Sequence, residues 1–283
     1  MLLVRIAYAP RERVRLYNSG GEGKHEAVKS MGRFRMSTYL LLVHGIGEQQ
    51  PGTYFDFGIR IRRATHEWFY WDEAYWADVT QPDEQLLKAR VGRGGLLHSF
   101  YIGSFGDLVA YSKLPYPPDK YTEIQRRFGQ RVYLAGIYAQ EHNDTDAQLS
   151  VIGHSLGSVI ASDGLYDMIK SGAFPPNMKL KCFFTMGSPL ALFGLRYGLE
   201  NFNKPVRPQT WLNFYYREDV AALALKPLNA AYSEAVTEDI CLSPDGLKHR
   251  LMAMVPGLGI KSHSWYFTDR RVIDRIAREL SKP

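Results

Sequence analysis

The sequence predicts an α/β domain with a mostly parallel central sheet and helices on both faces. Short continuous apolar runs, such as Thr38–Val43 and Leu149–Ile152, are typical of strands that are buried on both faces. Segments with helical periodicity alternate with these runs, and strands that alternate with helices form parallel sheets. The length of 283 residues and the hydrophobic fraction of 45% fit one large domain with an ordinary core.

The first convincing strand is Thr38–Val43, which ends in His-Gly. Residues 76–78 are expected to end a second strand. A helix is then predicted between Asp119 and His142, because apolar residues recur there at spacings of three and four. These residues are Tyr121, Ile124, Phe128, Val132, Ala135 and Ala139.

The second half of the chain repeats the pattern. The strand Leu149–Ile152 precedes a helix from about residue 156 to 170, which Gly172 and Pro175 close. Lys179–Met186 and Trp211–Tyr216 are further strands. The last helix has Asp269 as its N-cap and a single apolar face made of Val272, Ile273, Ile276 and Leu280.

The formal net charge of +6 is unevenly distributed. Residues 1–36 hold eight of the 35 basic and three of the 29 acidic residues, which leaves 27 and 26 for residues 37–283. We therefore divide the chain into a basic extension, 1–36, and a catalytic domain, 37–283. The extension is either a strand pair or a disordered arm, and its charge suits contact with an anionic membrane or another subunit. Because the body is almost neutral, no nucleic-acid partner is expected.

Targeting and metal-binding signals are not apparent in the sequence. The apolar start breaks at Arg5, no apolar run reaches the length of a membrane span, and the two cysteines lack metal spacing. His66-Glu67 and Glu141-His142 each lack the second histidine that a zinc site needs. We expect a cytoplasmic protein without metal or cofactor, and its oligomeric state is not readable.

The segment Gly153-His-Ser-Leu-Gly157 lies between a predicted strand and a predicted helix. This Gly-x-Ser-x-Gly pattern is typical of a sharp turn that forces the serine into a strained backbone conformation, while the two glycines let strand and helix approach closely. Ser155 is therefore the candidate nucleophile. The N–H of Leu156, at the helix N-terminus, is a candidate donor to developing negative charge.

With this turn the chain resembles the α/β-hydrolase superfamily, in the lipase and esterase branch that has a Gly-His-Ser-Leu-Gly elbow. The loop His44-Gly-Ile-Gly-Glu-Gln49 is similar to the oxyanion loop of a bacterial-type subset. The resemblance implies that the N–H of Ile46, or else of Gly47, is the second oxyanion donor, with Gly45 and Gly47 shaping the loop. We expect the His44 side chain to pack beside the loop, and Glu48 and Gln49 to hold its shape.

The general base is expected to follow the nucleophile and the acid in the chain. Only His249 and His263 follow Ser155, and the family resemblance favours His263, just before the final helix. The acid is expected between Ser155 and His263, on a loop after a later strand. The resemblance favours Asp219, and the alternatives are Glu218, Glu238 and Asp239.

The segment 54–121 is predicted to be an insertion, because it is long and holds 15 of the 37 aromatic residues. It is interpreted as a mixture of core packing and a partial cap over Ser155, with Leu96–Phe105 as a mobile apolar cap. Asp107 and Tyr111, four residues apart, are expected to support it. A cap of this kind suits a lipid-like substrate.

These features together predict a serine esterase or lipase that cleaves carboxylic esters through an acyl-enzyme on Ser155, with Asp219 and His263 completing the triad. A thioesterase, amidase or acyltransferase remains open, since fold and triad do not set the leaving group. A non-catalytic α/β-hydrolase scaffold is the alternative from another class.

Overall fold

The computed structural model describes residues 37–46, 49–91, 111, 119–202, 204–243 and 262–282. Several predictions fall outside these residues. They concern the extension 1–36, the cap Leu96–Phe105, Asp107, Gly47, Glu48 and His249.

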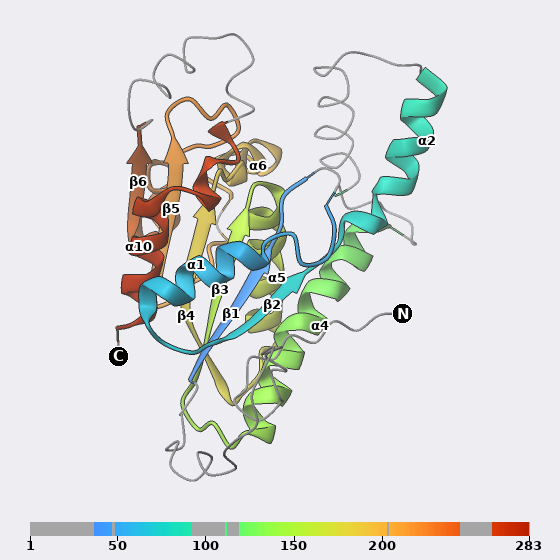
Figure 1. Cartoon of the computed structure of the whole chain (residues 1–283). Coiled ribbons are helices and arrows are strands. Elements are labelled where there is room, and N and C mark those ends of the chain that lie inside the picture. The colour runs from blue at the N-terminus through green and yellow to red at the C-terminus, as the bar shows by residue number, and fades with distance from the viewer. Residues whose placement is uncertain are drawn as a thin grey trace, which may run out of the picture.

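A six-stranded sheet runs through the centre of the molecule (Figure 1), and every neighbouring pair of strands is parallel. The strand order is β2-β1-β3-β4-β5-β6. The strands are β1 (Thr38–Val43), β2 (Tyr70–Ala74), β3 (Ala147–His154), β4 (Met178–Met186), β5 (Thr210–Tyr216) and β6 (Glu238–Leu242). The predicted α/β class with a parallel sheet is therefore confirmed.

Helices cover both faces of this sheet. In Figure 1, α1 (Phe55–Thr65) and α10 (Arg270–Leu280) lie in front of it, while α4 (Lys120–Glu141) and α5 (Leu156–Ser171) lie behind it. Because side chains alternate along a strand, β1 sends Leu40 and Leu42 to the α1 and α10 side, and Tyr39, Leu41 and Val43 to the other. Both faces are consequently dry, which explains the continuous apolar run.

Shorter elements complete the described chain. They are α2 (Gln81–Val91), α6 (Leu190–Tyr197), α7 (Ala230–Ala235) and the 3₁₀ turns η1 (Ala77–Val79), η2 (Lys226–Leu228) and η3 (Trp265–Phe267). The prediction that residues 76–78 end a strand is wrong, because β2 ends at Ala74 and these residues enter η1. There the Val79 N–H bonds the Trp76 carbonyl within a local turn, not across a sheet.

The predicted helix starts are confirmed at two caps. The Asp119 carboxylate accepts a hydrogen bond from the Thr122 N–H at 2.7 Å and so caps α4. The Asp269 carboxylate caps α10 in the same way, through the Arg271 N–H at 2.8 Å. At the C-terminal end of α5, Gly172 takes a left-handed conformation with φ +74°, as a helix-terminating glycine does.

Most of the described aromatic residues in segment 54–121 are core residues. Residues 55–74 include α1 and the edge strand β2, so this part of the segment belongs to the α/β body and not to a cap. The buried members are Tyr54, Phe57, Phe69, Trp71, Trp76 and Tyr111. Core packing therefore accounts for the aromatic enrichment in this part of the segment, and the predicted cap Leu96–Phe105 lies outside the described residues.

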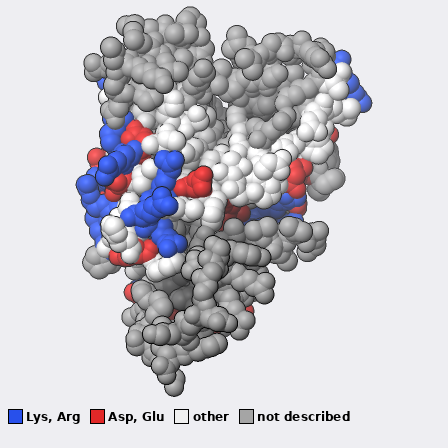
Figure 2. Space-filling model, viewed as in Figure 1, with Lys and Arg blue, Asp and Glu red and all other residues white. Residues whose placement is uncertain are grey.

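The surface over α1 and α10 is rich in Lys and Arg, with acidic residues between them (Figure 2). Several of these cations pair with carboxylates, as in the contacts Arg271–Asp269 at 2.6 Å and Arg275–Glu238 at 2.7 Å. This face is thus a mixed, solvated surface. In the part of the chain that the structure describes, no helix is both long and apolar enough to cross a membrane.

The course of the chain through the sheet defines where a site can form. From β1 the chain passes to β2 on one side and then to β3 on the other, so the sheet reverses its winding between β1 and β3. In open parallel sheets, ligands bind beyond the carboxyl ends of the strands at such a reversal. Val43 pairs with Gly153 at the ends of these two strands. The loop after β1 and the turn after β3 therefore leave the sheet side by side.

Candidate active site

Ser155 occupies the turn between β3 and α5. Its backbone has φ +52° and ψ −131°, a conformation that side-chain-bearing residues rarely adopt and that costs on the order of 1–3 kcal/mol. The Ser155 N–H donates to the carbonyl of Met186 on β4 at 2.9 Å, which anchors the turn to the neighbouring strand. The strained turn predicted from the sequence is present.

The two flanking glycines permit this turn for steric reasons. A Cβ on Gly157 would lie 2.2 Å from the carbonyl oxygen of Val43, and one on Gly153 would lie 2.5 Å from the Cα of Ser158. Both distances are far inside van der Waals contact with backbone atoms, which cannot rotate away. Glycine at these positions thus brings α5 against both β1 and β3.

Hydrogen bonds among buried serines support the turn around Ser155. The Ser158 hydroxyl donates to the Ser155 carbonyl at 2.6 Å and lies 2.6 Å from the hydroxyl of Ser188. Ser188 in turn accepts from the Leu190 N–H at 3.2 Å, at the start of α6. Ser158 and Ser188 are both fully buried, so these bonds lie away from water and tie the turn to the segment after β4.

His44, the first residue after β1, is a buried packing residue, as the sequence analysis expects. Its Nδ1 donates to the Gly45 carbonyl at 2.7 Å, and its Nε2 accepts from the Trp76 N–H at 3.0 Å. The Trp76 indole stacks on the imidazole and donates to the His44 carbonyl. Burial lowers the pKa of His44 to about 4, so the ring is neutral at pH 7.

The loop after β1 lies directly against Ser155. A Cβ on Gly45 would be 2.7 Å from the Ser155 Cβ, so only glycine fits between them. Gln49 shapes the far side of the loop, since its carbonyl accepts from Tyr75 at 3.1 Å and from Gln81 at 3.3 Å. Within the described residues, no hydrogen bond from the N–H groups of Ile46 and Leu156 to a protein acceptor is seen.

Asp219 and His263 form a direct pair. The His263 Nδ1 lies 2.8 Å and 3.0 Å from the two carboxylate oxygens of Asp219, whose side chain is wholly buried. Because a carboxylate only accepts, Nδ1 carries a proton, so in the neutral form of the ring the free lone pair is on Nε2. Burial by itself raises the pKa of Asp219, but the hydrogen bonds and charge of His263, with Tyr266 and the Ala221 N–H, hold it below its usual value.

His263 is also tied to the turn around Ser155 through His154. The His154 Nε2 donates to the main-chain carbonyl of His263 at 2.7 Å, and the two imidazole rings lie 4.8 Å apart. Burial, with His263 close by, lowers the pKa of His154 to about 3, so this ring is neutral as well. Among the described contacts no hydrogen bond joins the Ser155 hydroxyl to His263, and such bonds often tighten only when substrate binds.

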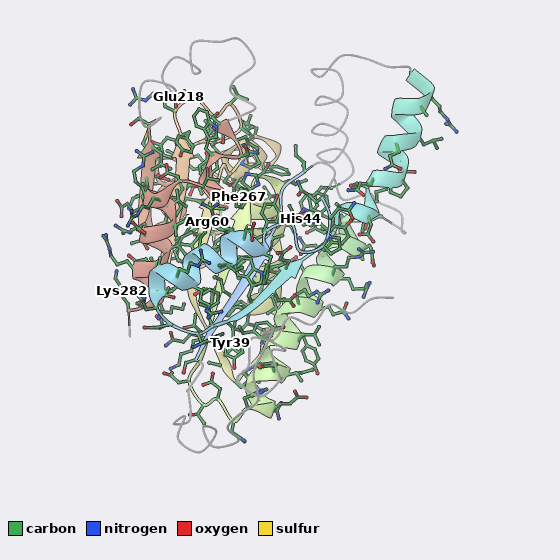
Figure 3. The ribbon with its side chains drawn as sticks, viewed as in Figure 1. Tyr39, His44, Arg60, Glu218, Phe267 and Lys282 are labelled. Carbon is green, nitrogen blue, oxygen red and sulfur yellow. The ribbon has the colours of Figure 1, made fainter. Side chains whose placement is uncertain are left out.

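The alternative acids have other roles in the structure. The Asp239 carboxylate accepts from the Asn213 amide at 2.7 Å and from the Lys226 N–H at 2.8 Å, so it holds the segment after β5. Glu238 pairs with Arg275 of α10. Figure 3 places Glu218 in the upper half of the view, as it does Phe267 and His44, with Tyr39 at the opposite end of β1. Of these candidates only Asp219 contacts His263.

Two residues at this site were missed by the sequence analysis. They are His154, whose position inside the elbow motif marks it only as a variable residue, and Tyr266, which donates to Asp219 at 2.7 Å. Neither contact has a local sequence signal, because each joins segments more than 40 residues apart. Among the described residues no cluster of three or more His, Cys, Asp or Glu side chains is suited to hold a metal ion.

Comparisons with known proteins return structural similarity only. The sequence matches no protein-family model, and a search of curated proteins finds no match. The esterase domain of a Rhodothermus marinus protein is 15% identical, with a TM-score of 0.37 over 89% of this chain and 87% of that one. The hyperthermophilic esterase from Pyrobaculum calidifontis is 10% identical, with a TM-score of 0.44 over 87% and 77%. A thermostable carboxylesterase from a metagenomic library is 12% identical, with a TM-score of 0.43 over 89% and 83%.

Proposed function

We propose that this protein is a serine hydrolase of the α/β-hydrolase type that cleaves carboxylic esters through an acyl-enzyme on Ser155. One observation carries the proposal. A serine with φ +52° stands at the carboxyl edge of the sheet, beside the reversal between β1 and β3, and His154 next to it is bonded to the loop of a buried His263–Asp219 pair. A structural turn has no need of a strained serine and a histidine oriented by a buried carboxylate.

The proposed reaction follows from the proton positions. As the Ser155 oxygen attacks the ester carbonyl, His263 takes the serine proton on Nε2 and later returns it to the leaving alcohol. Asp219 keeps the other ring nitrogen protonated and stabilises the imidazolium that forms. Water, activated by the same histidine, then releases the acid from Ser155.

The N–H groups of Leu156 and Ile46 are the proposed donors to the oxyanion. Leu156 opens the 16-residue helix α5, whose N-terminal dipole adds positive potential at the same point. Ile46 lies on the loop that contacts Ser155 through Gly45. Losing one such donor commonly slows acyl transfer by about two to three orders of magnitude.

Apolar side chains near this edge support an ester with an apolar part. The segments that follow β4 and β5 expose large hydrophobic residues, of which Val220 is 76% and Leu195 69% accessible, together with Leu192, Leu199 and Leu223. Val220 follows Asp219 directly. A small or lipid-like ester therefore fits the surroundings of the site better than a charged substrate.

A fluorophosphonate probe tests the proposal directly. We expect the folded protein to become labelled on Ser155 and the Ser155→Ala variant to remain unlabelled, with mass spectrometry of the tryptic peptide as the readout. Ser188→Ala is the matched control, because that serine is buried beneath the turn, and it should still be labelled at Ser155. A wild-type protein that stays unlabelled would instead favour the non-catalytic scaffold.

The leaving group needs a second assay. A series of p-nitrophenyl esters of increasing chain length, run beside matched thioesters and anilides, separates an esterase from a thioesterase or an amidase. We expect the esters to have the highest kcat/KM, and transfer to an added alcohol to be slower than hydrolysis. Faster turnover of the thioesters would reassign the reaction while leaving the roles of Ser155, His263 and Asp219 unchanged.

A further inference from the structure

Tyr266 contacts Asp219, the proposed acid, but is not part of the proposed triad. Its side chain is fully buried, and its hydroxyl donates to the Asp219 Oδ2 at 2.7 Å. The same hydroxyl oxygen accepts from the main-chain N–H of Tyr216, at the end of β5, at 3.0 Å. Because that N–H occupies a lone pair of the phenol, the single phenolic proton is directed at the carboxylate.

The carboxylate is thereby surrounded by donors. Oδ2 faces His263 and Tyr266, and Oδ1 faces His263 and the Ala221 N–H at 3.1 Å. The Asp219 side chain has no solvent exposure. Water therefore cannot replace the phenol without a rearrangement, and in this buried place each donor has a large effect on the charge of the anion.

Gly187 shows how tightly the three side chains are packed. Its φ of +61° belongs to the left-handed region, and a Cβ there would lie 3.0 Å from the Asp219 Oδ2, from the His263 Cε1 and from the Tyr266 Cε2. The acid, the base and the tyrosine thus converge on a single point after β4. The phenol is part of that assembly and not merely a neighbour of it.

We propose that Tyr266 is a positioning residue that orients Asp219 toward His263 and, by withdrawing charge from the carboxylate, weakens the attraction between Asp219 and the protonated imidazole of His263. The inference rests on the proposed function for its catalytic meaning. The hydrogen-bond geometry that supports it is independent of any substrate.

The sign of the effect follows from the surrounding charges. A donor to Asp219 weakens the attraction between the carboxylate and a protonated imidazole, so its removal favours the protonated ring at higher pH. The other described titratable groups around the pair are neutral His154, the adjacent Glu218, and Tyr216, which bonds Asp269. Asp269 is itself paired with Arg271. Removing the Tyr266 hydroxyl leaves all of these side chains in place, and the one further hydrogen bond that it deletes is the one from the Tyr216 main-chain N–H.

The test is Tyr266→Phe, with Tyr216→Phe as its matched control. Both changes delete one buried phenolic oxygen bonded to an aspartate, but only the first aspartate touches His263. We expect Tyr266→Phe to move the acid limb of the kcat/KM profile upward by about half a pH unit to one unit and to lower kcat about tenfold, with KM nearly constant. The control should leave the limb within about 0.2 of wild type.

A second readout does not depend on turnover. The NMR titration of the His263 Cε1–H signal should move upward in Tyr266→Phe by the same amount as the acid limb. If Tyr266→Phe fails to fold because the Tyr216 N–H loses its acceptor, 3-fluorotyrosine placed at position 266 replaces it. This more acidic phenol is a stronger donor, so it should move the titration in the opposite direction.

The outcomes separate the two proposals. Suppose that the protein is inert toward esters and fluorophosphonate, but its His263 titration responds to Tyr266→Phe and to 3-fluorotyrosine at position 266. The proposed function is then wrong, and the role of Tyr266 is supported. An active enzyme whose acid limb and His263 titration match wild type in both variants at position 266 would overturn the inference. In that case Tyr266 has only a packing role, whatever its effect on the melting temperature.

Discussion

The turn around Ser155 and the Asp219–His263 pair are held by opposite means. The turn is made of five consecutive residues, 153–157, and backbone collisions that exclude a Cβ at Gly153 and Gly157 define its shape. Asp219 is 44 residues from His263 and 47 from Tyr266 along the chain, and side-chain hydrogen bonds hold it to both. The turn should therefore tolerate the loss of a hydrogen bond but not an added methyl group. The pair should behave in the reverse way.

The largest effect should come from Asp219→Asn. An amide in this place turns its own N–H₂ toward His263 and so favours the wrong tautomer of the ring, and we expect kcat/KM to fall by about 10³- to 10⁴-fold. The measurement is ester hydrolysis at pH 7 to 8. Asp239→Asn is the control, because it makes the same change at a carboxylate that only holds the chain after β5. An Asp219→Asn enzyme with a tenth of wild-type activity would exclude Asp219 as the acid.

Gly157→Ala should show the steric character of the turn. The added Cβ would collide with the carbonyl oxygens of Val43 and His44, so the free energy of unfolding should drop by more than about 4 kcal/mol, or folding should fail. Gly129→Ala in α4 is the control. There a Cβ meets only the Met168 sulfur at 3.7 Å, and the helix should gain about 0.5–1 kcal/mol. Urea unfolding of both variants gives the comparison, and equal stabilities would contradict the account of the turn.

The two buried histidines, His44 and His154, make the stability of the fold depend on pH. The pKa of His44 is lowered to about 4 and that of His154 to about 3, from an ordinary value of 6.5. Between those values the unfolded chain binds more protons than the folded one, so stability is full above pH 6.5 and falls as the pH drops. Each histidine should remove about 1.4 kcal/mol per pH unit in this window.

Unfolding free energies measured from pH 7 to 4.5 check this dependence. His154→Gln should reduce the slope by about half while keeping a side-chain donor to the His263 carbonyl. A stability that is flat below pH 6.5 in wild type, or a slope that His154→Gln leaves unaltered, would contradict it.

The smallest effect should come from the serine network under the turn. Ser158→Ala removes a donor to the Ser155 carbonyl, and we expect a loss of about 1 kcal/mol with kcat within about threefold of wild type. Ser171→Ala, at the exposed end of the same helix, should change stability by less than about 0.5 kcal/mol. A larger rate loss than stability loss in Ser158→Ala would mean that the turn also relies on hydrogen bonds.

Local patterns were sufficient for much of the fold. The alternation of apolar strands with helical stripes predicted the parallel sheet, and Asp119 and Asp269 marked the first turns of α4 and α10. The strand expected to end at 76–78 was wrong, and the mixture of core and cap expected for segment 54–121 left open which aromatic residues are core, as Phe57 of α1 and Trp71 of β2 are. Aromatic content alone does not distinguish a buried edge strand from an apolar surface, because burial depends on what packs against it.

The sequence by itself determined the elbow around Ser155 and the class of the sheet, because glycine sterics and apolar periodicity act between residues close in the chain. Only the tertiary structure decided that Asp219, of four acids, contacts His263, that His154 holds the carbonyl of that histidine, and that Tyr266 donates to the acid. These contacts join distant segments that meet only when parallel strands bring their carboxyl ends to one edge. The spacing of residues along the chain does not predict such contacts.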